Sequence, residues 1–182
     1  DVKPFRKQPY DIMSRGMART FQNIRLFKEL SVIDNIKVGL HESMKYNLAS
    51  SLLRMPNYWK EEKHCTERAF ELLDIFHMAD MAYTQAGSLP YGAQRRLEIM
   101  RALATSPKLL LLDEPAAGLD PEGRDEILSE VKEYHKKTGT TVLLVSHSME
   151  DIAKYANRVL VMSNKKIAMY DTVENVFARA PE

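Results

Sequence analysis

Two adjacent carboxylates directly after a run of four leucines offer the clearest chemistry in this sequence. Leu109–Leu112 is followed by Asp113 and Glu114. An uninterrupted apolar run of this length predicts a strand buried on both faces of a parallel sheet, and ligands gather at the carboxyl ends of such strands. Asp113 could hold a magnesium ion that bridges phosphate oxygens there, while Glu114 could polarise an attacking water. For an isolated pair, a solvated turn is the favoured alternative.

Two more polar residues stand at the ends of predicted strands. Gln22 follows the apolar and β-branched run Met17–Phe21, and Ser146-His147 closes the run Thr141–Val145. Taken singly, Gln22 would be an ordinary polar strand end, and His147 a structural histidine with satisfied hydrogen bonds. Their meaning therefore depends on the motifs around them.

A helix start with an exposed backbone is the third candidate site. Its residues are Leu89, Pro90, Tyr91, Gly92, Ala93 and Gln94. Backbone N–H groups at a helix start can bind an anion, and a glycine lets the anion approach closely. Further along, Asp120 follows Gly118-Leu119, where on its own it would be a helix cap or a turn acid.

The first half of the chain reads as mostly helical. Ser31, with Asp34 three residues later, resembles a capping box that opens a helix. Trp59–Met78 has apolar residues at helical spacing and charges on its other face, and Pro56-Asn57 marks a break before it. The segment 31–86 is thus predicted to be a helical insert between two strand-bearing parts.

After Gly87 helices and strands alternate. The pattern predicts helices at 92–105, about 122–137 and 173–179, and strands at 109–112, 141–145, 158–162 and 167–170. Two buried strands joined by a crossover helix indicate an α/β architecture.

Composition excludes some classes of function. The chain has 182 residues with 26 basic and 25 acidic side chains, so its net charge of +1 gives no general attraction to nucleic acid or to an anionic membrane. Its single cysteine, Cys65, cannot form a disulfide within the chain. No apolar run approaches the roughly twenty residues that cross a bilayer, so we expect any membrane role to be peripheral.

The order of these motifs resembles the ABC ATPase domain, in which a glutamine loop, a signature, magnesium-site acids, a D-loop and a switch histidine follow one another. The resemblance covers nearly the whole chain. It implies a P-loop NTPase-like α/β core with a helical insert. Residues 1–30 would be the end of the core with the glutamine loop, 31–87 the helical subdomain, and 88–182 the core with the remaining motifs.

The resemblance also implies roles for the candidate residues. Asp113 would hold Mg²⁺, Glu114 would activate water, and His147 would contact the γ-phosphate of ATP. Gln22 would contact the magnesium or the attacking water and link the core to the insert. Asp120 would communicate across a dimer of two such subunits.

The signature departs from the common family pattern. Residues 89–94 would bind the γ-phosphate of the nucleotide held by the opposite subunit. Pro90 stands where the family usually has serine, so a hydroxyl contact is lost and backbone donors around Gly92 and Ala93 remain. The proline form is similar to that of branched-chain amino acid importer ATPases, and we interpret it as a variant that keeps its function.

The phosphate-binding Walker A loop is missing from this sequence. No Gly-x-x-x-x-Gly-Lys-Ser/Thr occurs; Gly87 and Gly92 have the right separation, but Ala93 follows where lysine is required. In the family this loop, its strand and its helix precede the glutamine loop, so we expect them to lie before Asp1. The full parent would then hydrolyse ATP, whereas this chain alone would bind it weakly or not at all.

Two parts of the chain resemble two different subfamilies. Residues 17–118 resemble branched-chain amino acid importer ATPases, whereas residues 119–179 resemble energy-coupling-factor ATPases for vitamin or metal uptake. We give the first part more weight, since in this family the helical insert meets the membrane subunit. The implied partners are permease subunits, a second ATPase subunit and, indirectly, a substrate-binding protein, at the cytoplasmic face of the membrane.

Two rival interpretations belong to other classes. A soluble ABC ATPase of DNA repair would carry long coiled-coil heptads between glutamine loop and signature, and none occur here. A truncated module that binds a partner through its helical insert, without hydrolysis, is favoured by the missing loop. The intact Glu114 and His147 favour an enzyme as the parent.

Overall fold

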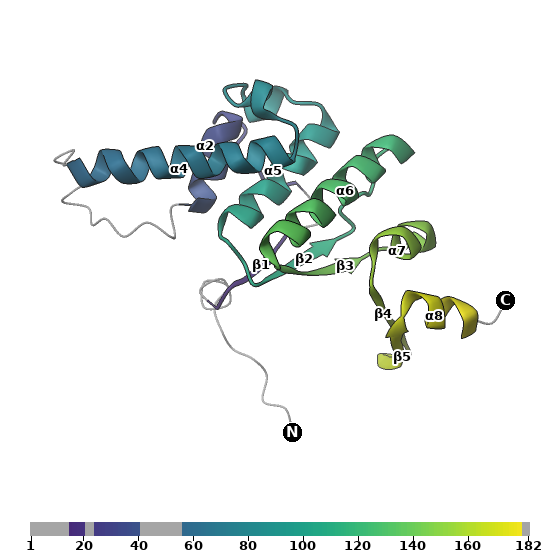
Figure 1. Cartoon of the computed structure of the whole chain (residues 1–182). Helices are drawn as coiled ribbons and strands as arrows, with labels where there is room; N and C mark the ends of the chain where they lie inside the picture. Colours follow the sequence, from purple (N-terminus) through teal and green to yellow (C-terminus); the bar gives the residue numbers. More distant parts are fainter. Residues whose placement is uncertain (1–14, 21–23, 41–55, 180–182) are drawn as a thin grey trace.

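The computed structural model describes residues 15–20, 24–40 and 56–179. In chain order the elements are β1 (Met17–Arg19), α2 (Val32–Leu40), α4 (Pro56–Ile75), the short 3₁₀ helices η2 (Ala79–Met81) and η3 (Ala86–Ser88), α5 (Tyr91–Ala104), β2 (Leu109–Asp113), α6 (Pro121–Thr138), β3 (Thr141–Val145), α7 (Met149–Tyr155), β4 (Arg158–Ser163), β5 (Lys166–Thr172) and α8 (Val173–Arg179) (Figure 1).

A three-stranded parallel sheet lies at the centre of the fold. Its spatial order is β1-β2-β3, with Met17 opposite Leu109 and Leu109 opposite Thr141. The helical segment from α2 to α5 connects β1 to β2, and α6 connects β2 to β3. Parallel neighbours need such long crossovers, so the predicted α/β architecture with a helical insert is confirmed.

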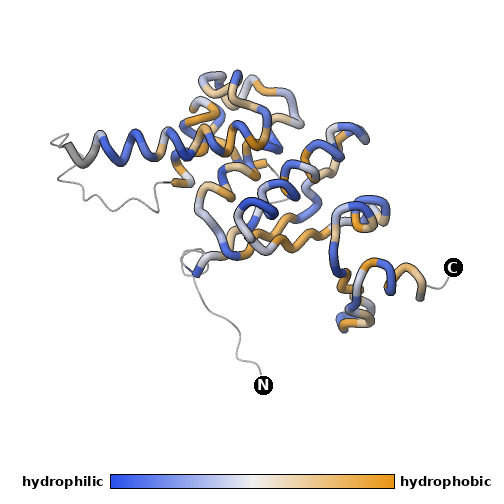
Figure 2. The backbone as a smooth tube through the Cα atoms, in the orientation of Figure 1, coloured by the Kyte–Doolittle hydropathy of each residue, from blue (hydrophilic) through white to orange (hydrophobic). Residues whose placement is uncertain are grey.

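The two faces of this sheet differ in burial. Helices α5 and α6 lie on one side of it (Figure 1), where Leu110 and Leu112 are completely buried. On the other side Leu143 is 47% and Val145 is 43% exposed. The predictions that the Leu109–Leu112 strand is buried on both faces and that Thr141–Val145 is a second buried strand are therefore wrong for the described residues, because the covering helices lie on one face only. Figure 2 shows β3 as a hydrophobic strand despite this exposure.

The helical insert begins with the predicted cap. The Ser31 hydroxyl oxygen accepts from the Asp34 backbone N–H at 3.2 Å and donates to the Asp34 carboxylate at 2.5 Å. Gly39 then lets α2 pack closely on α5, since a Cβ there would lie 2.5 Å from the carbonyl oxygen of Arg101. Helix α4 begins at Pro56, within the predicted break, because proline is tolerated in the first helical turn.

One hydrophobic core joins the insert to the sheet. It includes Ile36 from α2, Phe76 at the end of α4, Leu97 from α5 and Leu110 from β2, all of them fully buried. The helices that carry the candidate signature are therefore packed against the same core as the strand that carries the candidate acids.

The chain ends in a separate hairpin with a helix. Strands β4 and β5 are antiparallel, and within the described residues they pair only with each other. Their turn has positive φ angles at Asn164 (50°) and Lys165 (61°), which suits the right-handed twist of a tight hairpin. The two short strands and the final helix predicted from the sequence are confirmed.

Candidate functional site

The ends of β2 and β3 bring the candidate acid and the candidate histidine together. Asp113 is opposite Val145 in the sheet, and the backbone N–H of Glu114 donates to the Val145 carbonyl at 3.0 Å. This pairing places Glu114 Oε1 3.4 Å from Nε2 of His147. Two residues that are 33 positions apart in the sequence thus form one site, as far as the described residues show.

Glu114 has an unusual environment for a carboxylate. Its side chain is 19% exposed, and its Oε1 atom is buried without a hydrogen bond from any described residue. The backbone φ of 48° is in the left-handed region, which a non-glycine residue adopts only where its surroundings enforce it. The Glu114 Oε1 atom thus lacks a hydrogen-bond donor among the described residues, and the imidazole of His147 beside it is 95% exposed. A polar ligand that enters from solvent could bond to both groups.

Asp113 is paired with a cation. Its Oδ2 accepts from Nη2 of Arg19 at 2.9 Å, across the neighbouring strand β1. No group of three or more acidic, histidine or cysteine side chains that could hold a metal occurs among the described residues. Magnesium sites often use only one or two carboxylates together with substrate phosphates and water, so a single hard oxygen ligand at this strand end fits such an ion.

The predicted signature forms the start of α5. Pro90 is the residue before the helix and offers no side-chain cap, and Gln94 donates its backbone N–H to the Pro90 carbonyl at 3.0 Å. The backbone N–H groups of Tyr91, Gly92 and Ala93 precede this bond, so they have no acceptor within the helix. This confirms the predicted helix start, while its role as an anion site stays a prediction.

The signature touches the predicted D-loop, residues 118–120, and the residue just before it in the same chain. The Tyr91 hydroxyl donates to the Ala117 carbonyl at 3.4 Å, and a Cβ at Gly92 would lie 3.5 Å from the side chain of Leu119. Asp120 caps α6, accepting from the Gly123 backbone N–H at 3.2 Å. The described geometry of Asp120 is thus that of a helix cap, and its role across a dimer stays a prediction.

Gln22 lies outside the described residues. The structure places only its preceding neighbours: β1 ends at Arg19, and the backbone N–H of the buried Thr20 donates to the Leu111 carbonyl at 3.0 Å. The predicted position of Gln22 at a strand end therefore stays a prediction.

Sequence reasoning missed Arg95. This arginine is fully buried, and its guanidinium donates to the carbonyls of Asp113, Glu114 and Pro115, next to the candidate acids. The only local signal is Glu98 at i+3 on the same helix, because an arginine and a glutamate at this spacing can pair. Such pairs usually lie on a helix surface, so the signal does not predict burial.

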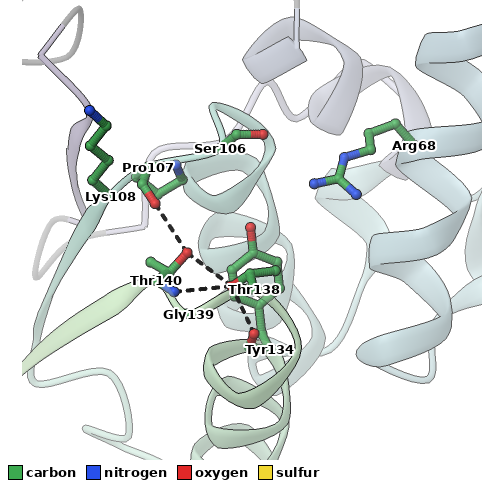
Figure 3. A pocket seen from close by; sticks show the side chains of 8 residues that line it. All are labelled: Arg68, Ser106, Pro107, Lys108, Tyr134, Thr138, Gly139 and Thr140. Atoms are coloured by element: carbon green, nitrogen blue, oxygen red, sulfur yellow. Dashed lines mark hydrogen bonds between the residues drawn. The ribbon is translucent and has the colours of Figure 1, made fainter.

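Two cavities lie at opposite ends of the strands. One, of about 360 Å³, is at the carboxyl ends and is lined by Glu114, His147 and Arg124 among others. The other, of about 380 Å³, is at the amino ends, where Tyr134, Thr138 and Thr140 border it (Figure 3). The two threonine hydroxyls in this second cavity are bonded to each other and to backbone carbonyls. Of the two candidate acids, Glu114 lines the first cavity.

A match to a family model decides the assignment. The model described as ABC transporter matches residues 1–117, which is more than half of the chain. The chain belongs to the ABC transporter family. This confirms the resemblance inferred from the order of the motifs.

The ABC relatives include both groups that the motifs indicate. The high-affinity branched-chain amino acid transport ATP-binding protein LivG of Escherichia coli K12 is 39% identical over 155 residues, covering 84% of this chain and 60% of LivG. The energy-coupling factor transporter ATP-binding protein EcfA2 of Caldanaerobacter subterraneus is 42% identical over 125 residues, covering 68% of this chain and 44% of EcfA2. The chain thus spans less than two thirds of these curated relatives.

Solved ABC structures share the fold. The ATP-binding cassette MJ1267 of an ABC transporter superposes with a TM-score of 0.75 at 29% identity, covering 95% of this chain and 69% of that one. Among the described residues of this ABC family member, no helix is long and apolar enough to span a membrane.

Proposed function

We propose that the protein containing this chain is the ATP-binding and ATP-hydrolysing subunit of an ABC importer. The observation that carries the proposal is the contact between Glu114 and His147, 3.4 Å apart at the ends of adjacent strands. A carboxylate and an imidazole at this edge of a parallel sheet can act together on a water molecule and a phosphate. Membership in the ABC transporter family supplies the reaction to which this pair is suited.

Each site residue has one task in the proposed reaction. The Glu114 carboxylate accepts a hydrogen bond from the attacking water, and His147 donates one to the γ-phosphate. Asp113 supplies an oxygen ligand for Mg²⁺, which offsets negative charge on the phosphates when it is bound. We propose that Gln22 orients the same water or ligates the ion. Residues 89–94 present backbone N–H groups to the nucleotide of a second subunit.

The proposed cargo is a branched-chain amino acid. Support comes from LivG, which is named for high-affinity branched-chain amino acid transport and aligns with 84% of this chain. Vitamin or metal uptake through an energy-coupling-factor transporter is the second candidate, because EcfA2 has the slightly higher identity of 42% over a shorter stretch.

The proposed partners follow from the division of the chain into a helical subdomain and an ATPase core. We propose that residues 31–87 form the subdomain that meets a permease, and that 1–30 and 88–182 belong to the ATPase core. The subunit would work as a dimer on the cytoplasmic face of the membrane, with a substrate-binding protein acting indirectly through the permease.

A calorimetric titration of MgATP tests the proposal. We would titrate this chain and a longer version that includes its native upstream segment, since no Walker A sequence occurs in residues 1–182. Only the longer version is expected to bind. Its hydrolysis should fall about 100-fold or more in Glu114→Gln, which cannot act as a base, and should persist in the control Glu174→Gln, which changes an exposed glutamate on α8.

Two results would contradict this proposal. Hydrolysis that survives in Glu114→Gln would remove the role of Glu114. Failure of the longer version to bind MgATP would favour the alternative of an interaction module that does not hydrolyse ATP.

A further inference from the structure

A buried arginine lies behind the candidate acids and has no role in the function proposed above. Arg95 is in the second turn of α5, and its side chain is 1% exposed. The guanidinium is charged at any physiological pH, so its burial is strongly unfavourable unless nearly all its N–H groups are bonded. Glu98, on the next turn, accepts from Nη1 at 2.6 Å and supplies the opposite charge.

Three further bonds of Arg95 go to one short turn. Its Nη2 donates to the Asp113 carbonyl at 3.1 Å and to the Glu114 carbonyl at 3.0 Å, and its Nε donates to the Pro115 carbonyl at 3.1 Å. Three consecutive carbonyls thus converge on one planar group. A guanidinium can span them because its donors form a rigid fork.

This turn contains the strained residue of the site. With φ at 48°, Glu114 is in a strained conformation for a non-glycine residue, which persists only when neighbouring contacts enforce it. One side of the turn is held by β3, through the bond from the Glu114 N–H to Val145. Arg95 holds the carbonyl side.

We propose that Arg95 is a positioning residue for ATP hydrolysis: it fixes the backbone of residues 113–115 so that the Glu114 carboxylate stays against His147. The proposal rests on the proposed function, since it assigns a task within that reaction. Arg95 bonds the carbonyls of this turn and acts through the backbone, whereas Glu114 lines the cavity that His147 also lines.

Lysine is the informative replacement at this position. Arg95→Lys keeps a positive charge beside Glu98, but one ammonium on a flexible stem cannot donate to three carbonyls in a fixed plane. The control is Arg96→Lys, the same change one position further, where the side chain pairs with Glu126 and Glu130 on α6. A double variant, Arg95→Met with Glu98→Leu, removes both buried charges together and so avoids an unpaired carboxylate in the core.

Steady-state kinetics of the full-length subunit assembled with its permease give the first readout. For Arg95→Lys we expect kcat to fall about 10- to 100-fold, the size of effect that a small misplacement of a reacting group produces, with KM for MgATP changed by less than about 3-fold. The double variant should lose kcat similarly while remaining folded. The Arg96→Lys control should keep kcat within about 3-fold.

Amide hydrogen exchange on the present chain gives a readout that does not depend on hydrolysis. The N–H groups of Glu114 and Ala117, which donate to Val145 and Glu114, should exchange about 10-fold faster or more in Arg95→Lys, and amides of α8 should not change. Full kcat in both Arg95 variants, or unchanged exchange at Glu114 and Ala117, would overturn the proposal. A wild-type complex without ATPase activity would instead refute the proposed function, while exchange would still decide whether Arg95 holds the turn.

Discussion

The two faces of the central sheet have the same kind of residues and opposite surroundings. Leu110 and Leu112 are completely buried beneath the helices, whereas Leu143 and Val145, on the other face, are nearly half exposed. Because alternate residues of a strand point to opposite sides, both faces come from the same apolar runs. The covered face therefore stabilises this chain, and the open face is apolar surface that the described residues leave in contact with water.

The difference between the two faces explains why the site is rigid and still open to solvent. The acids and His147 lie at the strand ends, where the covered face supplies Arg95 and the open face leaves the imidazole in solvent. A sheet covered on both sides within the described residues would hold the same side chains with less room for a ligand.

The first prediction compares the loss of a buried leucine with the loss of an exposed leucine, one from each face of the sheet. Leu110→Ala should lower the free energy of unfolding by about 2–5 kcal/mol, because it leaves a cavity in a fully buried position. Leu143→Ala, on the neighbouring strand but on the open face, should lower it by about 1 kcal/mol or less. Urea denaturation of this chain measures both, and equal losses would show that the open face is covered.

The second prediction concerns the helix that covers the buried face. Burial raises the pKa of Glu130 on α6 to about 7, with Glu126 and Glu133 adding to the rise and Arg96 opposing it. The folded state therefore favours the protonated carboxyl, and the stability that this gives is lost as pH rises from about 4.5 to about 7.

Glu130→Gln removes the ionisation and should relieve this loss. Relative to wild type, it should be more stable at pH 8 by about 1–2 kcal/mol, a value reduced from the full shift because solvent screens part of the charge, and little changed at pH 4.5. Thermal melts at several pH values, with Glu122→Gln as an exposed control on the same helix, measure the difference. A gain that is independent of pH would contradict a raised pKa.

The third prediction concerns a double substitution on the open face of the sheet, for which we expect the smallest change in stability. Leu143→Thr combined with Val145→Thr keeps strand-forming residues on β3 but makes the open face more polar. We expect unfolding free energy to change by about 1 kcal/mol or less, since both side chains are partly hydrated already. Binding of a hydrophobic dye should fall by at least half if this face is the main exposed apolar surface, and should stay unchanged if it is not.

Local signals predicted the elements better than their surroundings. The Ser31 cap, the helix start after Pro90 and the strand before Asp113 depend on nearby residues, and the structure confirms them. The predicted burial of β2 on both faces, and of β3 as a second buried strand, is wrong, because burial depends on what packs against a strand, which an apolar run alone does not state.

The residues of the candidate site also differ in how well the sequence predicts them. Glu114 and His147 could be placed at strand ends because parallel strands bring their carboxyl ends to one edge. Arg95 could not be found, since nothing local distinguishes its buried position from the more accessible one of Arg96. The bonds that make Arg95 informative come from a turn about twenty residues away and exist only after folding.

The contact between Tyr91 and Ala117 has a consequence for assembly. It fastens the helix start at residues 89–94 to the loop before α6, and Gly92 rests against Leu119 of the same loop. We propose that both segments meet a second subunit. Segments already fixed to one another lose less conformational entropy on association than two independent loops would. A second subunit would thus dock against one pre-organised corner, and loosening it should slow the formation of the dimer before it weakens the individual fold.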